Sequence, residues 1–465
     1  MATHFKRALG PFDATMVVVG GIIGAGIFIN PYIVAQRLPS SGWVLAAWAA
    51  GGAIALAGAL AYAELGSLFP QAGGQYVYLR DAYHPLAGFL YGWALLLLIE
   101  CGAIAAVAIT FAEYALRLAG RGDASALPLA IAAIVVVSAI NYLGVKPGSR
   151  VLNVFVVLKV AALAILIGAG FLIAPSTPEV GLDAGVRMGA AAGAGAPPDG
   201  SAAALPILFG AALIPILFSY GGWQNANYVA EEIADPRRNL PRSLLAGTLL
   251  VAAVYVLVNV VYLRALGLEG LAATRTPASD AAGRLLGPAG DRFIAAAIAV
   301  STFGFLDLAV LAPTRVYYAM AADGLFFRGV ARLHPRFRTP SLAIVLQAAW
   351  SIALALTGTY AALVDTVVFA DWIFFGLTVA SVLVFRRRLP LASRAPGGFR
   401  APLYPVLPIL FAIVSMGVVA SVVASNPVRS AVGAALLLAG IPAFLYWSRR
   451  APTPAEEAKG RGERE

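Results

Sequence analysis

The sequence has 465 residues, of which 60% are hydrophobic and only 12% are charged. A soluble globular chain is usually about 25% charged, so this composition argues against ordinary soluble domains. The formal net charge of +10 could suggest a nucleic-acid partner. The basic residues lie in loops between apolar runs, however, which is typical of a membrane protein and argues against that partner. The single cysteine, Cys101, excludes an internal disulfide framework and a cysteine metal cluster.

Apolar runs of about 20 residues recur along the chain, and each is long enough to cross a hydrocarbon core of about 30 Å. The runs are continuous rather than alternating, which predicts membrane-spanning helices. We expect about twelve, near residues 14–36, 43–66, 86–117, 126–145, 150–173, 204–232, 243–264, 291–321, 341–358, 361–384, 404–424 and 429–447. The first run is too long for a cleavable signal peptide, and no small-residue cleavage site follows it.

Basic residues gather in alternate loops, which predicts the orientation of the chain. They are Lys6, Arg7, Lys146, Arg150, Arg237, Arg238, Arg242, Arg328, Arg332, Arg336, Arg338, Arg386, Arg387, Arg388, Arg394, Arg400, Arg449 and Arg450. By the positive-inside rule this side is cytoplasmic, so we expect a multi-pass protein of the cytoplasmic (inner) membrane with both termini inside. The loop after span 7 runs against this pattern, because it holds four arginines: Arg264, Arg275, Arg284 and Arg292.

Two of the expected spans contain interruptions. Span 1 reads VVVGGIIGAGIFINP, with four glycines near its middle, and span 6 carries Pro215 followed by Gly221 and Gly222. Glycine costs a helix about 1 kcal/mol relative to alanine, and an unwound turn in lipid exposes backbone groups that water cannot satisfy. Close packing through small residues could explain one such span. Interruptions at matching positions of two spans instead indicate a transporter binding site near the membrane midplane.

The ends of half-helices attract charge. Free amides and a positive dipole end are expected where the second half of span 1 begins, at Gly24, Ala25 and Gly26, and a carboxylate would suit them. Free carbonyls that suit an ammonium are expected where the first halves of the two spans end, at Ile22, Ile23, Phe218 and Ser219. Two such poles lying close together predict a site for an α-amino acid zwitterion.

Three segments resemble the amino acid–polyamine–organocation family, most closely its L-amino-acid transporter branch: GGIIGAGIFINP in span 1, AYAELGSLFPQAGGQYVYL across span 2 and its loop, and FSYGGWQNANYVAEEIADPRRNLPRSL across span 6. The resemblance covers about residues 10–445. It implies an all-α polytopic LeuT-type fold with a 5+5 inverted repeat, and secondary transport of amino acids by alternating access. The expected parts are a cytoplasmic N-terminus (1–13), a first five-helix repeat (14–173), an extracellular loop (174–203), a second repeat (204–384), a basic cytoplasmic loop (385–403), two additional helices (404–447) and a cytoplasmic tail (448–465).

The resemblance also implies roles for individual residues. Gly24-Ala25-Gly26 matches the family's Gly-Ser-Gly turn, which holds the substrate carboxylate, although the alanine lacks a hydroxyl. Phe218 matches the aromatic residue that closes over the substrate, with ordinary packing as the alternative. Gln224 follows Gly221 closely and lies where relatives often have asparagine, at the mouth of the side-chain pocket.

Lys159 is a lone lysine within span 5, and such residues are functional candidates unless they snorkel to an interface. In relatives a matching lysine takes the place of a sodium ion between spans 1 and 8. The resemblance therefore implies that its ammonium bridges carbonyls near Gly21 and the hydroxyl of Ser301 or Thr302, and that transport is independent of sodium. Two mechanisms stay open: a fixed strut in an exchanger, or a group that loads and releases a proton.

Acidic residues within the spans add further candidates. Glu100 in span 3 and Asp307 in span 8 could recognise a cationic side chain or carry a proton. The alternative is an internal pair, for instance Asp307 with Arg315 or Lys159. Three acids near span ends are expected to pair with cytoplasmic arginines: Glu64, Glu231 and Glu232.

Two other classes of protein fit less well. A membrane enzyme needs a nucleophile with a base or a metal cluster, but His4, His84 and His334 lie in the tail or loops, so we expect no catalytic residue, metal or cofactor. An amino-acid-sensing receptor on a transporter scaffold would usually carry a long cytoplasmic domain, which is not seen here. The expected partners are an amino acid, the lipid bilayer and, for symport, protons. The sequence indicates neither the amino acid nor a partner subunit.

Overall fold

The computed structural model describes residues 7, 9–122, 124–143, 145–173, 205–337, 339–357, 360–389 and 398–449, apart from the side chains at 145–151, 360–362, 364 and 365. The expected loop 174–203, part of the basic loop 385–403 and the residues beyond 449 lie outside this description. So do several residues used above: His4, Lys6, Arg338, Arg394, Arg450 and the side chains of Lys146 and Arg150.

The described residues fold into helices, apart from loops and a bridge between Leu9 and Ile233. The first half contains α1 (Pro11–Ile22), α2 (Gly26–Arg37), α3 (Ser41–Leu68), α4 (Gln75–Ala82), α5 (Pro85–Ala94), the π-helix η1 (Leu95–Ile99), α6 (Glu100–Leu118), α7 (Leu127–Leu143) and α8 (Val145–Leu172). The second half contains α9 (Leu205–Tyr220), α10 (Asn225–Tyr228), the 3-10 helix η4 (Ala230–Glu232), α11 (Pro236–Ala273), α12 (Pro277–Leu311), α13 (Thr314–Ala322), the 3-10 helix η5 (Arg328–Ala331), α14 (Ser341–Thr357), α15 (Tyr360–Arg388), α16 (Val406–Ser425), α17 (Pro427–Leu438) and α18 (Gly440–Ser448).

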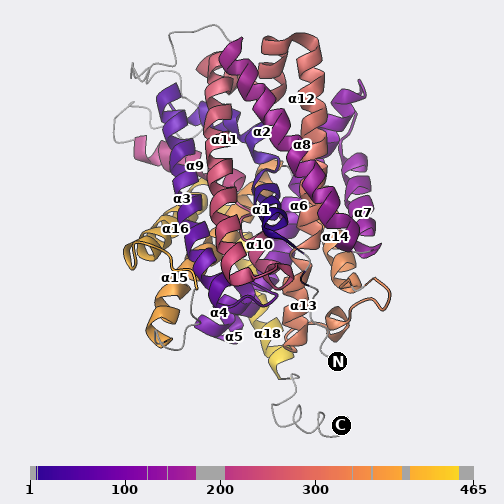
Figure 1. Cartoon of the computed structure of the whole chain (residues 1–465), viewed down its shortest axis with the longest axis vertical. Helices are drawn as coiled ribbons and strands as arrows, with labels where there is room; N and C mark the ends of the chain where they lie inside the picture. The colour runs from indigo at the N-terminus through magenta and orange to yellow at the C-terminus, as the bar shows by residue number, and fades with distance from the viewer. Residues whose placement is uncertain are drawn as a thin grey trace.

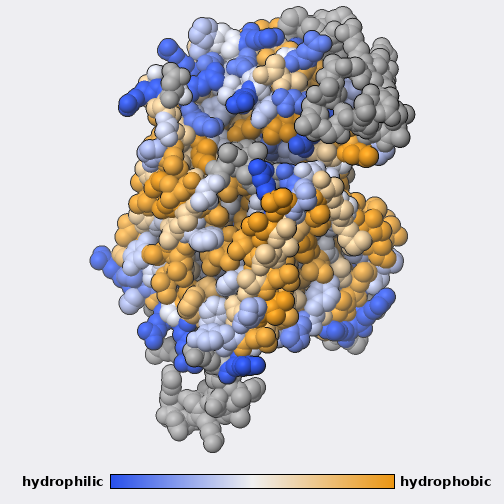
Figure 2. All heavy atoms as spheres, turned by 180° about the vertical axis from the view of Figure 1, so that it is seen from behind, coloured by the Kyte–Doolittle hydropathy of each residue, from blue (hydrophilic) through white to orange (hydrophobic). Residues whose placement is uncertain are grey.

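Twelve apolar helical segments match the expected spans. In the described ranges, nine are long and apolar enough to cross a membrane, and the shorter helices α7, α9 and α14 complete the set. The long helices run roughly along the long axis of the molecule, with α4, α5, α13 and α18 at the lower end of the view (Figure 1). From behind, a broad hydrophobic band crosses the middle, and hydrophilic residues concentrate toward the two ends (Figure 2). The prediction of an all-α polytopic membrane protein is confirmed.

The two spans rich in glycine are interrupted where the sequence predicts it. α1 ends at Ile22 and α2 begins at Gly26, while α9 ends at Tyr220 and the short α10 begins at Asn225. The second half of span 6 is not one continuous α-helix, because it consists of the single turn α10 followed by the 3-10 helix η4. Each interruption lies inside the bundle, where α11 contacts both α1 and α10.

Each broken span also contains a proline. Because proline has no backbone N–H, the carbonyl four residues earlier is left without its helical donor. For Pro215 that carbonyl belongs to Ala211, and the guanidinium of Arg37 donates to it from the end of α2. In α2 the equivalent carbonyl is that of Ile27, and the hydroxyl of Tyr262 lies 3.5 Å away. Side chains of neighbouring helices thus replace the donors that proline removes, as lipid-embedded helices require.

Three spans differ from their expected form. Span 3 is not one continuous α-helix, since the π-helix η1 lies directly before Glu100. Spans 7 and 8 continue beyond their apolar parts, and Gly267 and Gly287, each with φ of 71°, mark the bends. A search for apolar runs misses such extensions because their residues are more polar, and π-turns have no distinct sequence pattern.

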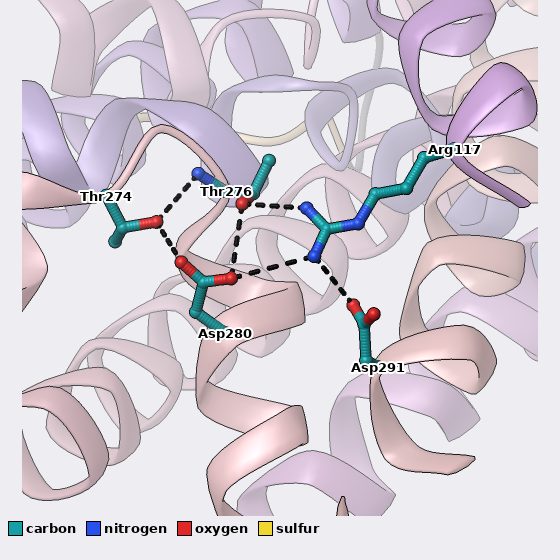
Figure 3. A network of polar contacts seen from close by, with 5 residues as sticks. All are labelled: Arg117, Thr274, Thr276, Asp280 and Asp291. Carbon is teal, nitrogen blue, oxygen red and sulfur yellow. Dashed lines mark hydrogen bonds and ion pairs between the residues drawn. The ribbon is translucent and has the colours of Figure 1, made fainter. Parts of the chain in front are cut away.

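A polar network joins the bend between α11 and α12 to the end of α6 (Figure 3). The Arg117 guanidinium donates to the hydroxyl of Thr276 at 2.9 Å and pairs with Asp291 at 3.1 Å. Asp280 lies 3.7 Å from the same guanidinium and also bonds the hydroxyl of Thr274. Two acids of α12 therefore pair with an arginine of α6. The orientation of the chain stays a prediction.

Glu232, near the end of span 6, contacts residues of two other segments. It pairs with Arg315 at 3.1 Å, but this arginine is buried in α13 and not in a cytoplasmic loop, which corrects the expected partner. Its carbonyl also accepts from the amide of Leu9 at 3.0 Å, so the backbone just before α1 is fixed here. Glu231 accepts a hydrogen bond from the amide of Ala72 at 3.2 Å.

Glu64 provides a test of a buried ion pair. It pairs with Arg386 at 2.6 Å and accepts from the amide of Ala401 at 2.8 Å, as expected of an acid at a span end. We predict that Glu64→Ala lowers the free energy of unfolding by about 3–5 kcal/mol, because it leaves the arginine without its partner. Thermal denaturation in detergent measures this. Asp81→Ala removes the exposed partner of Arg80 and should cost at most about 1 kcal/mol; equal losses in both variants would contradict the prediction.

Candidate functional site

The two interrupted spans meet backbone to backbone. A Cβ atom on Gly21 would lie 2.5 Å from the carbonyl oxygen of Gly222. Gly222 itself has φ of 114°, and a Cβ there would run into the carbonyl of Gly21, so only glycine fits at both positions. The hydroxyl of Tyr255 in α11 lies 3.0 Å from the Ile22 carbonyl and 3.1 Å from the Ser219 carbonyl. One side chain thus joins the ends of both first half-helices.

A second contact joins α2 to α9. A Cβ on Gly26 would lie 2.7 Å from the Cα of Ser219, so α2 begins directly against the end of α9. The buried amide of Asn30 donates at 2.8 Å to the Ser219 hydroxyl and at 2.8 Å to the Pro215 carbonyl. The start of α2 is therefore held in place by polar contacts as well as by close packing.

The predicted amide pole is present at the turn of span 1. The amides of Ala25 and Gly26 have no hydrogen-bond acceptor in the described part of the chain, and they lie at the start of α2, where its dipole is positive. The amide of Gly24 instead donates to the Ile22 carbonyl at 2.9 Å. Two of the three expected amides are thus available to a carboxylate.

The carbonyl pole differs from the expectation. The Ile23 carbonyl accepts from the ammonium of Lys159 at 2.8 Å, and Ile23 does not line the cavity described below. The carbonyls of Ile22 and Ser219 both face the hydroxyl of Tyr255. An unwound carbonyl in a membrane finds no water and needs a donor from the protein. The Tyr255 hydroxyl has one proton and can donate it fully to only one of these two carbonyls at a time, so both can still accept a further hydrogen bond.

A cavity lies between the two interruptions, α6, α12 and α15. The predicted residues that line it are Ile22, Gly24, Ala25, Gly26, Glu100, Phe218, Ser219, Gly221 and Gln224. Residues that the sequence analysis missed include Asn225, Phe305, Val367, Val368, Asp371 and Trp372.

Gln224 shapes the turn of span 6 as well as lining the cavity. Its Oε1 accepts from the amide of Gly222 at 2.9 Å, and the side-chain amide of Asn225 donates to the Gly222 carbonyl at 3.1 Å. Across the cavity, Phe305 packs on the turn of span 1, since a Cβ on Gly24 would lie 3.2 Å from its ring. Aromatic and amide side chains are common in such spans, so no sequence signal distinguished Phe305 or Asn225 before the fold placed them here.

Lys159 reaches the first interruption from α8 and is buried. Its ammonium bonds the carbonyl of Ile23, two residues beyond the expected Gly21. The predicted hydroxyl partners are not found in the described chain: Thr302 donates to carbonyls of its own helix, and the hydroxyl of Ser301 has no hydrogen-bond partner. A helical threonine commonly bonds the carbonyl one turn earlier, which directs its proton away from a neighbouring helix.

The two predicted acids lie in different environments. Glu100 lines the cavity, whereas Asp307 does not. Asp307 accepts from the side-chain amide of Asn141 at 2.7 Å, across the contact between α12 and α7. The alternative of an internal pair between Asp307 and Arg315 or Lys159 is not found, because Arg315 pairs with Glu232 of η4 and Lys159 bonds the turn of span 1.

Fold and site together define an α-helical membrane transporter in which two interrupted spans enclose a small-molecule cavity. The chain belongs to the amino acid permease family, whose model matches residues 9–447. It is 30% identical over 429 residues to the human b(0,+)-type amino acid transporter 1, covering 91% of this chain and 84% of that protein. It is also 30% identical to the human large neutral amino acids transporter small subunit 2, covering 96% of this chain and 82% of that one.

One bacterial relative aligns with this chain over almost the whole length of both proteins. The serine/threonine exchanger SteT of Bacillus subtilis (strain 168) is 30% identical over 448 residues, which are 96% of this chain and 98% of the exchanger. All three relatives are named as transporters or exchangers, so the family resemblance is confirmed and the chain is not an enzyme. The receptor alternative receives no support.

Gly26 provides the sharpest test of the site. Gly26→Val should reduce substrate binding by about a hundredfold, because the added side chain pushes the start of α2 away from Ser219. Counterflow into proteoliposomes, together with stabilisation of the purified protein by substrate, measures the effect. Gly417→Val is the matched control, because a Cβ at that helical glycine meets no atom within 4 Å. Normal transport by Gly26→Val would mean that the substrate binds elsewhere.

Proposed function

We propose that this chain is a sodium-independent secondary transporter that carries amino acids across the cytoplasmic membrane by alternating access. The observation that carries the proposal is the cavity formed by both interrupted spans, with the unpaired amides of Ala25 and Gly26 on its wall. Small-molecule transporters of this architecture bind substrate where broken helices expose their ends. The membership of the amino acid permease family supports an amino acid as that substrate.

The substrate carboxylate would bind at the start of α2. The positive end of the helix and two amides without an acceptor favour an anion there. Ala25 would contribute only its backbone amide. The lack of a serine hydroxyl in this turn therefore leaves both amides available to the carboxylate. The substrate ammonium would lie toward the carbonyls of Ile22 and Ser219, with the ring of Phe218 beside it.

Lys159 would supply the positive charge that a sodium ion provides in other transporters. Its ammonium bonds the Ile23 carbonyl within the first interruption, so the unwound turn is stabilised without a bound metal. The charge is covalently attached and cannot be released with the substrate. A chain that contains its own cation at this point has no need of external sodium.

Alternating access requires contacts at one end of the molecule to break while contacts at the other end form. The contacts of Glu232 with Arg315 and with the amide of Leu9 join span 6 to α13 and to the start of the chain. We propose that this end faces the cytoplasm, in agreement with the arrangement of basic residues, and that both termini lie inside. These contacts would separate when the cavity opens inward.

The role of Lys159 predicts indifference to sodium. Amino acid uptake into proteoliposomes should proceed at the same rate when choline replaces sodium in the external medium. Lys159→Met should retain a monodisperse elution profile but lose uptake, because the Ile23 carbonyl is left without its donor. A steep dependence of wild-type uptake on sodium would contradict this part of the proposal.

Exchange and proton symport predict different outcomes in liposomes that contain no amino acid. If Lys159 or Asp307 loads a proton in each cycle, an inward pH gradient should drive accumulation in the wild type, and Lys159→Ala should abolish it. If the lysine is a fixed strut, uptake should require internal amino acid and ignore the gradient. Only a group whose proton affinity differs between the two conformations can couple the gradient to transport. Measuring uptake with and without both gradient and internal substrate separates the mechanisms.

A further inference from the structure

Two buried carboxylates face the cavity from two helices that pack against each other, α6 and α15. Glu100 is the first residue of α6, directly after the π-helix η1, and Asp371 lies in α15. Their residues are only 5% and 7% exposed, and both line the cavity. No hydrogen bond or ion pair to either carboxylate is present in the described part of the chain, and Asp371 Oδ1 is fully buried without a partner.

Other buried acids of this chain have partners. Glu64 forms an ion pair with Arg386, and Glu232 forms one with Arg315. A buried carboxylate without a partner is costly, so proteins retain one mainly where function requires it. Glu100 and Asp371 therefore differ from structural acids, and their position on the cavity wall suggests that a ligand supplies the missing positive charge.

The protein offers no cation of its own at this wall. Among the described residues that line the cavity, Glu100 and Asp371 are acidic and none is a lysine or arginine. Lys159 lies nearby but is directed to the Ile23 carbonyl and does not line the cavity. The cavity is thus acidic at one wall, while the amides of Ala25 and Gly26 form an anion site at another.

We infer, building on the proposed function, that this cavity selects α-amino acids whose side chain carries a positive charge. The carboxylate would bind at the start of α2, and the cationic side chain would lie between Glu100 and Asp371. Apolar residues such as Ile99, Val367 and Val368 line the space around them and suit the methylene groups of such a side chain. A neutral amino acid fills the same space but leaves both carboxylates without a cation. A diamine pairs with the acids but leaves the amides without an anion.

The test compares lysine with norleucine, which has the same carbon chain without the side-chain amine. In proteoliposomes preloaded with lysine, unlabelled lysine should inhibit uptake of labelled lysine at a concentration at least about tenfold lower than norleucine does. Glu100→Gln and Asp371→Asn should each reduce this ratio toward one. Both substitutions keep the size of the side chain, and elution profiles confirm folding.

Glu113→Gln is the matched control. Glu113 lies in the same helix as Glu100, is exposed, and does not line the cavity, so the same substitution there should leave the ratio unchanged. A ratio that falls equally in this variant would show a general effect of charge and would overturn the inference.

The remaining outcomes separate this inference from the proposed function. Wild-type protein that accepts norleucine as well as lysine overturns the inference but leaves amino acid transport intact. Protein that transports neither these nor other amino acids overturns the proposed function itself. If the variants keep the wild-type preference and lose only the response of uptake to a pH gradient, the two acids carry a proton and the inference is wrong.

Discussion

The contact between Gly21 and Gly222 is the constraint on which the rest of the site depends. It brings two unwound turns together inside a lipid-embedded bundle, where neither has water to satisfy its backbone. Every feature around it can be understood as a response to this demand. The hydroxyl of Tyr255 lies within hydrogen-bond distance of one carbonyl from each turn, and the ammonium of Lys159 donates to the next carbonyl of span 1. The groups that remain unsatisfied lie on the wall of the cavity, where a substrate can reach them.

This constraint also explains why the turns are held so firmly. A loose interruption would expose backbone to lipid, so the protein fixes both turns with contacts from α8 and α11 and with Asn30 of α2. The same contacts would align the substrate poles in advance, which reduces the cost of ordering them when a ligand binds. On the proposed function, stability of the fold and recognition of the substrate would rest on the same hydrogen bonds.

The sequence predicts the helices and both interruptions well, because apolar length and clustered glycines have direct physical consequences in lipid. It predicts the partners of polar groups poorly. Lys159 was correctly expected to meet span 1, but Ser301 and Thr302 were not its partners, since rotation of α12 about its axis cannot be read from the sequence. Asp371 was missed altogether. It lies in a span with no interruption, and only the packing of α15 against α6 brings it to the cavity.

The acidic wall links substrate choice to the coupling mechanism. When the cavity is empty and closed from both sides, Glu100 and Asp371 would have to cross the occluded state as unpaired charges in a medium of low polarity. That state is costly, so an empty carrier that keeps both charges returns slowly. A second cationic amino acid removes the cost and permits exchange, whereas a proton taken up by one carboxylate removes it without a second substrate. Exchange and symport are then two ways to neutralise the same pair of carboxylates, and the choice between them depends on how readily the pair takes up a proton in the closed state.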